Sequence, residues 1–342
     1  MTATFADLYG KQLSLLSGHG LSKDFTLPAG PFSKGRKLHA VSDVSLQIGQ
    51  GESLGIVGES GCGKSTLGRL LAGLLPPTSG ELFFQGEPIV TGGRALPPHF
   101  RRQVQMIFQD PFSSLNPRMR AGEIIAEPLT IHGLARGSDL IDRVSQLMEM
   151  VGLSPEQALR YPHEFSGGQR QRIGIARALA VSPSLLIADE PLSALDLSIQ
   201  AQIINLLLEL KERLSLSLLF IAHDLSVVRH LSSSVAVMYL GRIVESGATE
   251  DLFNAPRHPY TEALLSALPH IDPTVKRRAL LLTGDLPDPS APPPGCPFHT
   301  RCPHVRSKRC HTEAPLLVQQ GVGRLAACHY STEIFGPPRP FA

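Results

Sequence analysis

The chain has 342 residues, of which 42% are hydrophobic and 18% charged, and its formal net charge is +2. This length accommodates two domains, and the composition is that of an ordinary globular protein, not of a disordered or membrane-spanning one. The longest apolar runs, such as 216–222, are far shorter than the roughly 18 residues that a transmembrane helix needs. Segment 1–20 lacks a basic start, so we expect no secretory signal and a cytoplasmic protein. The nearly balanced charge favours no nucleic-acid partner.

The predicted elements alternate between strands and helices, which indicates an α/β fold. Short strands are expected within 13–48, and nearly all-apolar runs later in the chain are typical of parallel strands buried on both faces. A hairpin is expected over 234–244, with its turn at Gly241. The further expected strands are 53–57, 81–85, 104–108, 185–188 and 218–221, and the expected helices are 65–75, 122–132, 139–151, 169–180 and 199–214. From about Leu268 the composition shifts to a proline-rich linker, followed by four of the five cysteines.

Residues 58–66 match the phosphate-binding pattern G-x-x-x-x-G-K-[ST]. Its glycines remove the Cβ atoms that would keep backbone N–H groups away from phosphate. Lys64 is expected to reach the β- and γ-phosphates, and Ser65 to offer its hydroxyl to Mg²⁺. The alternative, a glycine turn that only caps a helix, is disfavoured because an apolar strand precedes the loop and a helix follows it.

Asp189 and Glu190 follow an apolar strand and predict the second part of a phosphoryl-transfer site. Asp189 can hold Mg²⁺ directly or through water, and Glu190 can act as general base on the attacking water. His223 closes the strand 218–222, where it can hydrogen-bond the γ-phosphate. Taken alone, the acid pair could equally be a helix cap and the histidine structural.

These residues, with Gln109, Phe165-Ser166-Gly167-Gly168-Gln169 and Ser193-Ala194-Leu195-Asp196, resemble the ATP-binding subunits of ABC transporters over roughly 13–260. The resemblance implies a P-loop NTPase with a RecA-like core, an antiparallel β subdomain and an α-helical subdomain at about 110–182. It implies that two such domains pair head-to-tail, with each ATP between one P-loop and the partner's Ser166, Gly167, Gly168, Gln169 and Asp196. Residues expected to bind ATP or Mg²⁺ are Gly58, Glu59, Ser60, Gly61, Cys62, Gly63, Lys64, Ser65, Thr66, Gln109 and Asp189. Phe165 stands where leucine is usual.

Two further segments narrow the resemblance to ATPases of oligopeptide and dipeptide importers, a group that includes nickel importers. They are 109–117, which reads QDPFSSLNP, and 258–261, which reads HPYT. This branch implies an ATPase domain over 1–267 and a C-terminal extension over 268–342. It also implies a second ATPase subunit, two permeases and an extracytoplasmic binding protein, with the chain at the cytoplasmic face of the inner membrane. Phe25 is the first candidate for stacking on adenine, with Phe32 and His39 as alternatives.

Four cysteines lie within 33 residues of the extension, each with a histidine nearby: Cys296, Cys302, Cys310 and Cys328. Disulfides are not expected in a cytoplasmic protein, and no Cys-x-x-Cys pair is present for a typical zinc site. Four thiolates can hold an iron–sulfur cluster, and some importer ATPases similar to this chain carry a [4Fe–4S] cluster here. Zinc and free thiols are the alternatives. Because this tail is remote in sequence from Lys64 and Glu190, a structural or redox-sensing role is expected.

Other classes of P-loop protein fit less well. A P-loop kinase does not require the segment 166–169. A DNA-repair ATPase of related fold needs a long coiled-coil insertion between the two nucleotide motifs, which this chain lacks. A translation-associated ABC protein usually carries two such domains, and this chain has one. A non-catalytic subunit is disfavoured by the presence of Glu190 and His223. The sequence does not identify the transported solute.

Overall fold

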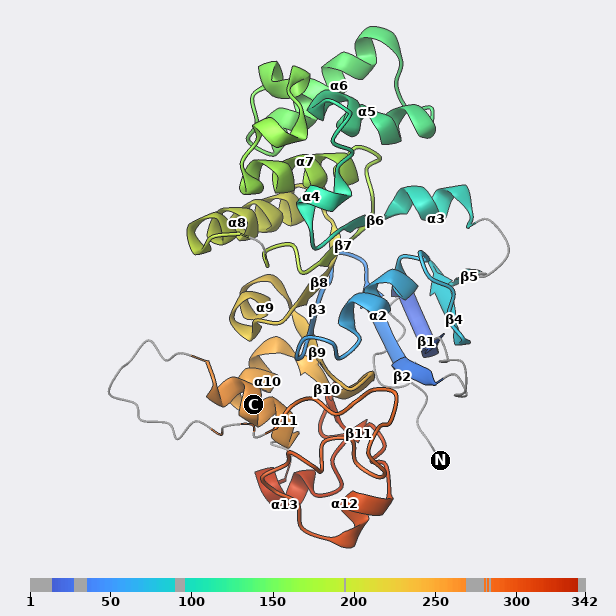
Figure 1. Ribbon diagram of the computed structural model, residues 1–342, viewed down its shortest axis with the longest axis vertical. Helices are drawn as coiled ribbons and strands as arrows, with labels where there is room; N and C mark the ends of the chain where they lie inside the picture. Colours follow the sequence, from blue (N-terminus) through green and yellow to red (C-terminus); the bar gives the residue numbers. More distant parts are fainter. Residues whose placement is uncertain are drawn as a thin grey trace. The chain divides into compact units, whose positions relative to one another are not determined.

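The computed structural model describes residues 14–27, 36–89, 96–193, 195–268, 280, 282 and 284–337. The chain divides into two compact units. The first, here the P-loop unit, comprises Met1–Ile48, Ser53–Gly92 and Ala222–Ala342. The second unit comprises Gly49–Glu52 and Gly93–Ile221. It contains the segment 166–169 and is here called the signature unit. Figure 1 follows the chain through both units by colour.

One sheet of the P-loop unit is antiparallel. It contains β1 (Ser14–Thr26), β2 (Lys37–Gly49), β4 (Ser79–Phe84) and β5 (Glu87–Ile89), in the order β2-β1-β4-β5. The expectation of several short strands over 13–48 is therefore wrong, because β1 and β2 each run for 13 residues. An irregularity in the β1–β4 register lies between His19 and Ser22, and Gly20 has φ +59° there. The bulge at Gly20 bends the strand without ending it, so β1 runs on to Thr26.

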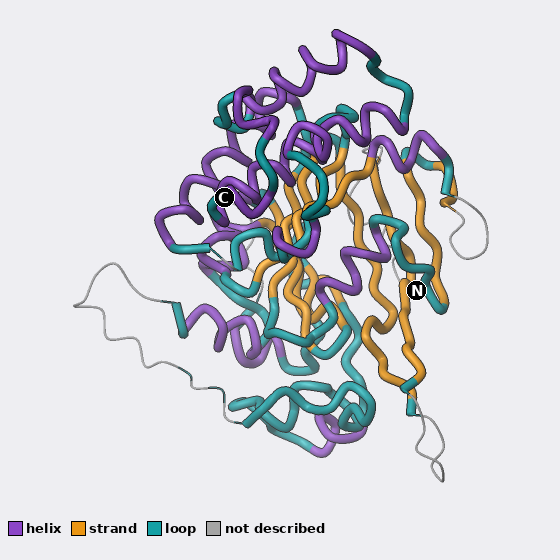
Figure 2. The backbone as a smooth tube through the Cα atoms, turned by 45° about the horizontal axis from the view of Figure 1, so that its top comes forward, coloured by secondary structure: helices purple, strands orange, loops and turns teal. Residues whose placement is uncertain are grey.

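A second set of strands in this unit carries the P-loop. β3 (Ser53–Val57) pairs in parallel with β9 (Ser234–Tyr239), which forms an antiparallel hairpin with β10 (Arg242–Ala248). The expected hairpin turn at Gly241 is confirmed, with positive φ at Leu240 and Gly241. From the extension, β12 (Leu325–Ala326) pairs with the free edge of β10, and β11 (Val318–Gln319) pairs with β12. The extension thus continues the sheet that carries the P-loop. Most of the described residues of the extension lie in loops and turns (Figure 2).

Short helices complete the P-loop unit. They are α2 (Lys64–Leu71), α9 (Leu225–Leu231), α10 (Thr249–Asn254), α11 (Pro259–Ser266), α12 (Lys308–Thr312) and α13 (Ser331–Phe335). Helix α2 ends at Leu71, four residues before the expected end. Gly73 adopts φ +69°, and the N–H groups of Leu74 and Leu75 both bond back to the carbonyl oxygen of Arg69. The left-handed glycine therefore closes the helix before the prolines do.

In the signature unit three parallel strands lie in the order β6-β7-β8: β6 (Val104–Ile107), β7 (Leu185–Asp189) and β8 (Ser217–Ala222). Every residue of β7 and β8 is buried, as their apolar sequences predict. The helices are α3 (Pro98–Gln103), α4 (Pro111–Ser114), α5 (Ala121–Ile131), α6 (Gly137–Met150), α7 (Gly167–Leu179) and α8 (Leu197–Leu214), with 3₁₀ turns at Pro155–Leu159 and Pro162–Glu164. Figure 1 shows α5, α6 and α7 gathered together. The four helices predicted in this unit, which are α5, α6, α7 and α8, are thus confirmed to within two residues at their ends, whereas α3 and α4 were not predicted.

In the part of the chain that the structure describes, no helix combines the length and apolar character needed to cross a bilayer.

Candidate nucleotide-binding site

The P-loop connects the end of β3 to the start of α2. Gly58, Gly61 and Gly63 have φ of +157°, +81° and +105°. A Cβ on Gly58 would lie 2.2 Å from the carbonyl oxygen of Met238, and one on Gly63 would lie 2.1 Å from that of Ala40. Both glycines that the pattern fixes, Gly58 and Gly63, are therefore also required by backbone packed against the loop, in addition to any ligand it takes.

Lys64, at the first turn of α2, is only 3% exposed. Its Nζ donates hydrogen bonds to the carbonyl oxygens of Gly58 (2.9 Å) and Glu59 (3.0 Å), so the ammonium is held inside the loop. Cys62 is buried beside it, and burial raises the pKa of its thiol to about 11. A protonated, enclosed thiol indicates that the Cys62 side chain has a packing role.

Glu59, the second residue of the P-loop, is held by the C-terminal part of the chain. Its backbone N–H donates to the Tyr260 hydroxyl at 2.9 Å. Its two carboxylate oxygens lie 3.0 and 2.9 Å from Nη1 of Arg301, whose side chain is 7% exposed. Because Arg301 precedes Cys302, the tail lies next to the P-loop in space, despite its remoteness in sequence. From the sequence, Arg301 is expected only to offset negative charge near the cysteines; its contact with Glu59 was missed, since an arginine in a loop carries no local sign of a partner 242 residues away.

In the signature unit, Asp189 ends β7 and is 1% exposed. Glu190 follows with φ +43°, and its N–H donates to the carbonyl oxygen of Ile221 at 2.9 Å. Nε2 of Gln109 donates to Oε2 of Glu190 at 3.1 Å. The structure thus brings together two residues that the sequence placed after neighbouring parallel strands, because the carboxyl ends of such strands meet at one edge.

The segment 166–169 forms the beginning of α7. Ser166 is the N-cap: its hydroxyl accepts from the Gln169 N–H at 3.3 Å, and Oε1 of Gln169 accepts from the Ser166 N–H at 3.0 Å. This reciprocal capping box fixes the helix start and leaves its positive end available to an anion. A Cβ on Gly168 would lie 2.5 Å from Cγ2 of Ile199 in α8, so this glycine is also needed for packing within the unit. Asp196 is the N-cap residue of α8.

The remaining sequence candidates are placed less distinctively. His223 follows β8 and is exposed. Phe25, half-buried near the end of β1, has the Lys23 ammonium 5.4 Å from its ring centroid. Nδ1 of His39 lies 2.8 Å from Oδ1 of Asp24, an ion pair when the histidine is protonated. Phe32 lies outside the described residues. The structure therefore does not single out an aromatic for adenine.

The four cysteines of the extension line one small cavity together with Phe298. The backbone N–H of Cys296 donates to the carbonyl oxygen of Cys310 at 2.9 Å. Burial raises the pKa of Cys296 to about 11 and that of Cys302 to about 12, and it also raises the pKa of Cys328. As the side chains lie, no group of three or more His, Cys, Asp or Glu residues within the described ranges is arranged to hold a metal ion.

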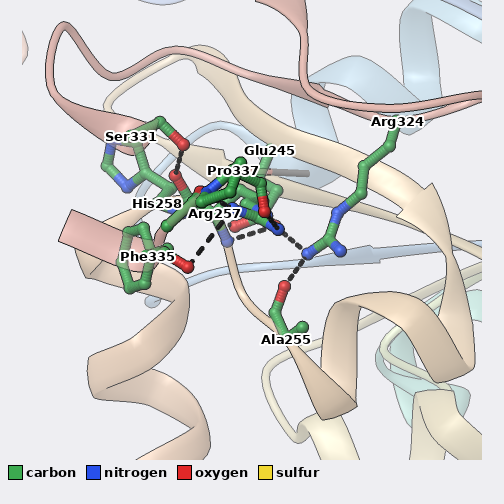
Figure 3. A network of polar contacts seen from close by, with 9 residues as sticks. Glu245, Ala255, Arg257, His258, Arg324, Ser331, Phe335 and Pro337 are labelled. Atoms are coloured by element: carbon green, nitrogen blue, oxygen red, sulfur yellow. Dashed lines mark hydrogen bonds and ion pairs between the residues drawn. The ribbon is translucent and has the colours of Figure 1, made fainter. Parts of the chain in front are cut away.

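A buried carboxylate anchors the extension to the rest of the P-loop unit (Figure 3). Glu245 in β10 is fully buried and accepts from the backbone N–H groups of Arg257 (2.8 Å) and His258 (2.9 Å). Nη2 of Arg324 lies 2.9 Å from its Oε1 and also donates to the carbonyl oxygen of Ala255. The HPYT segment and the strand region of the extension are thus tied to the same side chain.

A P-loop with an enclosed lysine is typical of proteins that bind nucleoside triphosphates. Among these proteins, the start of α7, with Ser166 as N-cap followed by Gly167 and Gly168, narrows the class further. Fold and site together define an ABC-type ATPase. Residues 41–193 match the ABC transporter family, and residues 244–310 match the oligopeptide/dipeptide transporter C-terminal region. The chain belongs to the ABC transporter family, among its ATP-binding subunits.

Two similar ATP-binding proteins match more than nine-tenths of the chain. It is 47% identical to the dipeptide transport ATP-binding protein DppF of Haemophilus influenzae, over 92% of this chain and 96% of the relative. It is 49% identical to the oligopeptide transport ATP-binding protein AppF of Bacillus subtilis, over 93% and 98%. A dimeric structure of an ATP-binding cassette in a post-hydrolysis state with ADP and phosphate is 28% identical, with a TM-score of 0.60, and covers 68% of this chain and 98% of that one.

Proposed function

We propose that this ATPase subunit energises the import of dipeptides or oligopeptides. The observation that carries the proposal is the match of 244–310 to the oligopeptide/dipeptide transporter C-terminal region, supported by relatives named as dipeptide and oligopeptide transport proteins. The subunit would work at the cytoplasmic face of the inner membrane, with a second ATPase subunit, two permeases and an extracytoplasmic binding protein. Uptake of nickel, or of another small solute, is the alternative.

The test is transport by the reconstituted complex. Proteoliposomes that contain this subunit, its partner ATPase and the permeases are supplied with the binding protein and with labelled dipeptide, tetrapeptide or nickel. Peptide uptake that requires ATP, and is lost when Lys64→Ala replaces the native subunit, is the expected result. Uptake of nickel but of neither peptide would replace this proposal with the alternative.

The proposed chemistry assigns one role to each site residue. Backbone N–H groups of 58–66 and the Lys64 ammonium bind the β- and γ-phosphates. To do so, Lys64 replaces its hydrogen bonds to the loop carbonyl oxygens with hydrogen bonds to phosphate oxygens. Ser65, Gln109 and Asp189 supply the neutral and anionic oxygen ligands that Mg²⁺ prefers. The Gln109 amide donates to Glu190, which leaves its carbonyl oxygen for the metal. Glu190 acts as general base on water, and His223 contacts the γ-phosphate.

We further propose a head-to-tail pair of ATPase subunits. The start of α7 is capped internally by Ser166 and Gln169, so its positive end suits a phosphate supplied from another subunit. Ser166, Gly167, Gly168, Gln169 and Asp196 would complete the partner's ATP site. The dimeric state of the similar cassette supports this arrangement. Hydrolysis by the isolated subunit should therefore be slow and should rise on addition of the partner ATPase and permeases, whereas full activity in a monomer that never dimerises would contradict it.

Finally, we propose a [4Fe–4S] cluster on Cys296, Cys302, Cys310 and Cys328. The support is that all four thiols line one cavity and supply the four-thiolate donor set that such clusters use. Since burial raises the pKa of Cys296, Cys302 and Cys328, binding must release protons from these thiols and draw the sulfurs together. Protein purified without oxygen should contain about four irons per chain and lose them in Cys302→Ser. One zinc per colourless chain would favour a zinc site, and no metal would leave plain thiols.

A further inference from the structure

We infer that Tyr260 and Arg301 are positioning residues for ATP binding: both hold the P-loop through Glu59, and Arg301, which comes from the C-terminal extension, neutralises the Glu59 carboxylate. The inference rests on the contacts of one loop residue. Glu59 is restrained through its N–H by Tyr260, through its carboxylate by Arg301, and through its carbonyl oxygen by Lys64. Two of these three restraints come from the C-terminal third of the chain.

The electrostatic argument begins with the side chain itself. A P-loop is an anion-binding loop, so a carboxylate on its second residue opposes the phosphates that the loop must bind. Arg301 removes this opposition, because Nη1 contacts both carboxylate oxygens and the guanidinium is always charged. Although burial works against the charge, the hydrogen bonds with Glu59 raise the pKa of Arg301.

The arginine is itself held in place by packing. Its backbone N–H donates to the carbonyl oxygen of Phe298 at 3.0 Å, and the Phe298 ring is 1% exposed. The ring centroid of Phe298 lies 5.3 Å from that of Tyr260 and 5.2 Å from that of Tyr239. One aromatic cluster thus positions both groups that contact Glu59, so the two restraints act as a unit.

Loss of Arg301 should leave an unpaired, partly buried carboxylate beside bound phosphate. Since the P-loop contacts phosphate in both the ground state and the transition state, the loss should appear in KM and hardly in kcat. In the assembled transporter, Arg301→Gln is expected to raise the ATP KM about tenfold, a coupling of the usual size for contacting charges, with kcat within about twofold. Arg301→Lys should be intermediate, because it keeps the charge but loses the planar guanidinium.

The decisive experiment is a double-mutant cycle with Glu59→Gln. If Arg301 acts through the carboxylate, adding Arg301→Gln to Glu59→Gln should change the ATP KM by less than about twofold. The matched control is Arg309→Gln, which removes an arginine from an exposed ion pair with Glu313 in the same extension and should leave KM unchanged. Binding of a fluorescent ATP analogue to the full chain provides a second readout in each variant.

Two results would overturn the inference. One is an Arg301→Gln variant that melts earlier but has the wild-type KM, which is what a purely structural arginine predicts. The other is a tenfold loss that persists in the Glu59→Gln background. Should Arg301→Gln fail to fold, two other variants still decide between these outcomes. Arg301→Lys retains both charges of the pair, and the double variant removes both.

Discussion

The side-chain amide of Gln109 donates to the carboxylate of Glu190 at 3.1 Å, linking the second residue after β6 to the residue that follows β7. The two proposed roles, metal ligand and general base, are therefore coupled through one hydrogen bond. Glu190 also has a left-handed backbone, with φ +43°, and its N–H donates to the carbonyl oxygen of Ile221 at 2.9 Å. A change of Glu190 that preserves shape is consequently the cleanest probe of its chemistry.

Glu190→Gln should bind ATP normally but hydrolyse it slower by roughly 10² or more, the contribution of a positioned general base. The amide oxygen of the new side chain can still accept from Gln109, so the geometry should survive. Steady-state hydrolysis in the assembled transporter measures the effect. Lys64→Ala is the contrasting variant, because it should weaken nucleotide binding itself. Near-native hydrolysis in Glu190→Gln would exclude Glu190 as the base.

Two glycines of α7 should respond in opposite ways to alanine. A Cβ on Gly168 meets Ile199 at 2.5 Å, whereas one on Gly174 meets nothing within 4 Å. Gly174→Ala should therefore stabilise the protein by up to about 1 kcal/mol through helix propensity, and Gly168→Ala should destabilise it by about 1–3 kcal/mol through overpacking. Urea unfolding of the isolated subunit tests this. Equal effects at both positions would refute the packing of α7 against α8.

This contact also changes how the head-to-tail arrangement should be tested. On the sequence alone, Gly168→Asp is a suitable test variant, since its carboxylate would repel the phosphate of the partner's ATP. In the structure it would also push against Ile199 within its own unit, so a loss of activity would not be specific to the partner's site. Ser166→Ala avoids this clash, because it adds no atoms, and the one capping hydrogen bond that it removes from α7 can be assessed separately by the stability of the isolated subunit.

Cys62 should resist alkylation although it lies in the P-loop. Its pKa is raised to about 11 by burial, so at pH 8 only about one thiol in a thousand is the reactive thiolate, and the fraction grows as pH rises. Iodoacetamide at pH 8, followed by peptide mass analysis, should leave Cys62 unmodified in folded protein and modify it after urea denaturation. Rapid modification in the folded protein would show that the thiol is exposed or activated.

Arg324→Ala should be among the most damaging changes in the extension. It leaves Glu245, whose side chain is 0% exposed, without its cationic partner, at a cost of about 3–5 kcal/mol. Arg213→Ala is the matched control, because Arg213 pairs with Glu209 on the exposed face of α8 and should cost less than about 1 kcal/mol. Denaturant unfolding of both variants makes the comparison. A small loss in Arg324→Ala would show that the Glu245 network is dispensable.

Much of the fold could be predicted because the signals are local. The strands at 53–57 and 185–189 are short apolar runs. The glycines and the lysine of 58–66 indicate a phosphate-binding loop within nine residues. By contrast, β11 and β12 are two residues each, too short for any periodicity, and they are strands only because β10 offers an edge. The contacts of Arg301 and Arg324 arise in the same way, from folding that joins distant segments.

The pairing of β12 with β10 has a consequence for how the chain is made. Synthesis proceeds from the N-terminus, so β10 leaves the ribosome well before β12 exists. During that interval β10 presents an open edge, and Glu245 lacks the arginine that accompanies it in the finished protein. Open edges of this kind invite pairing with other chains. The nascent protein should therefore depend on chaperones until its last segment emerges, and ribosome-bound chains stalled before Leu325 should be the aggregation-prone species.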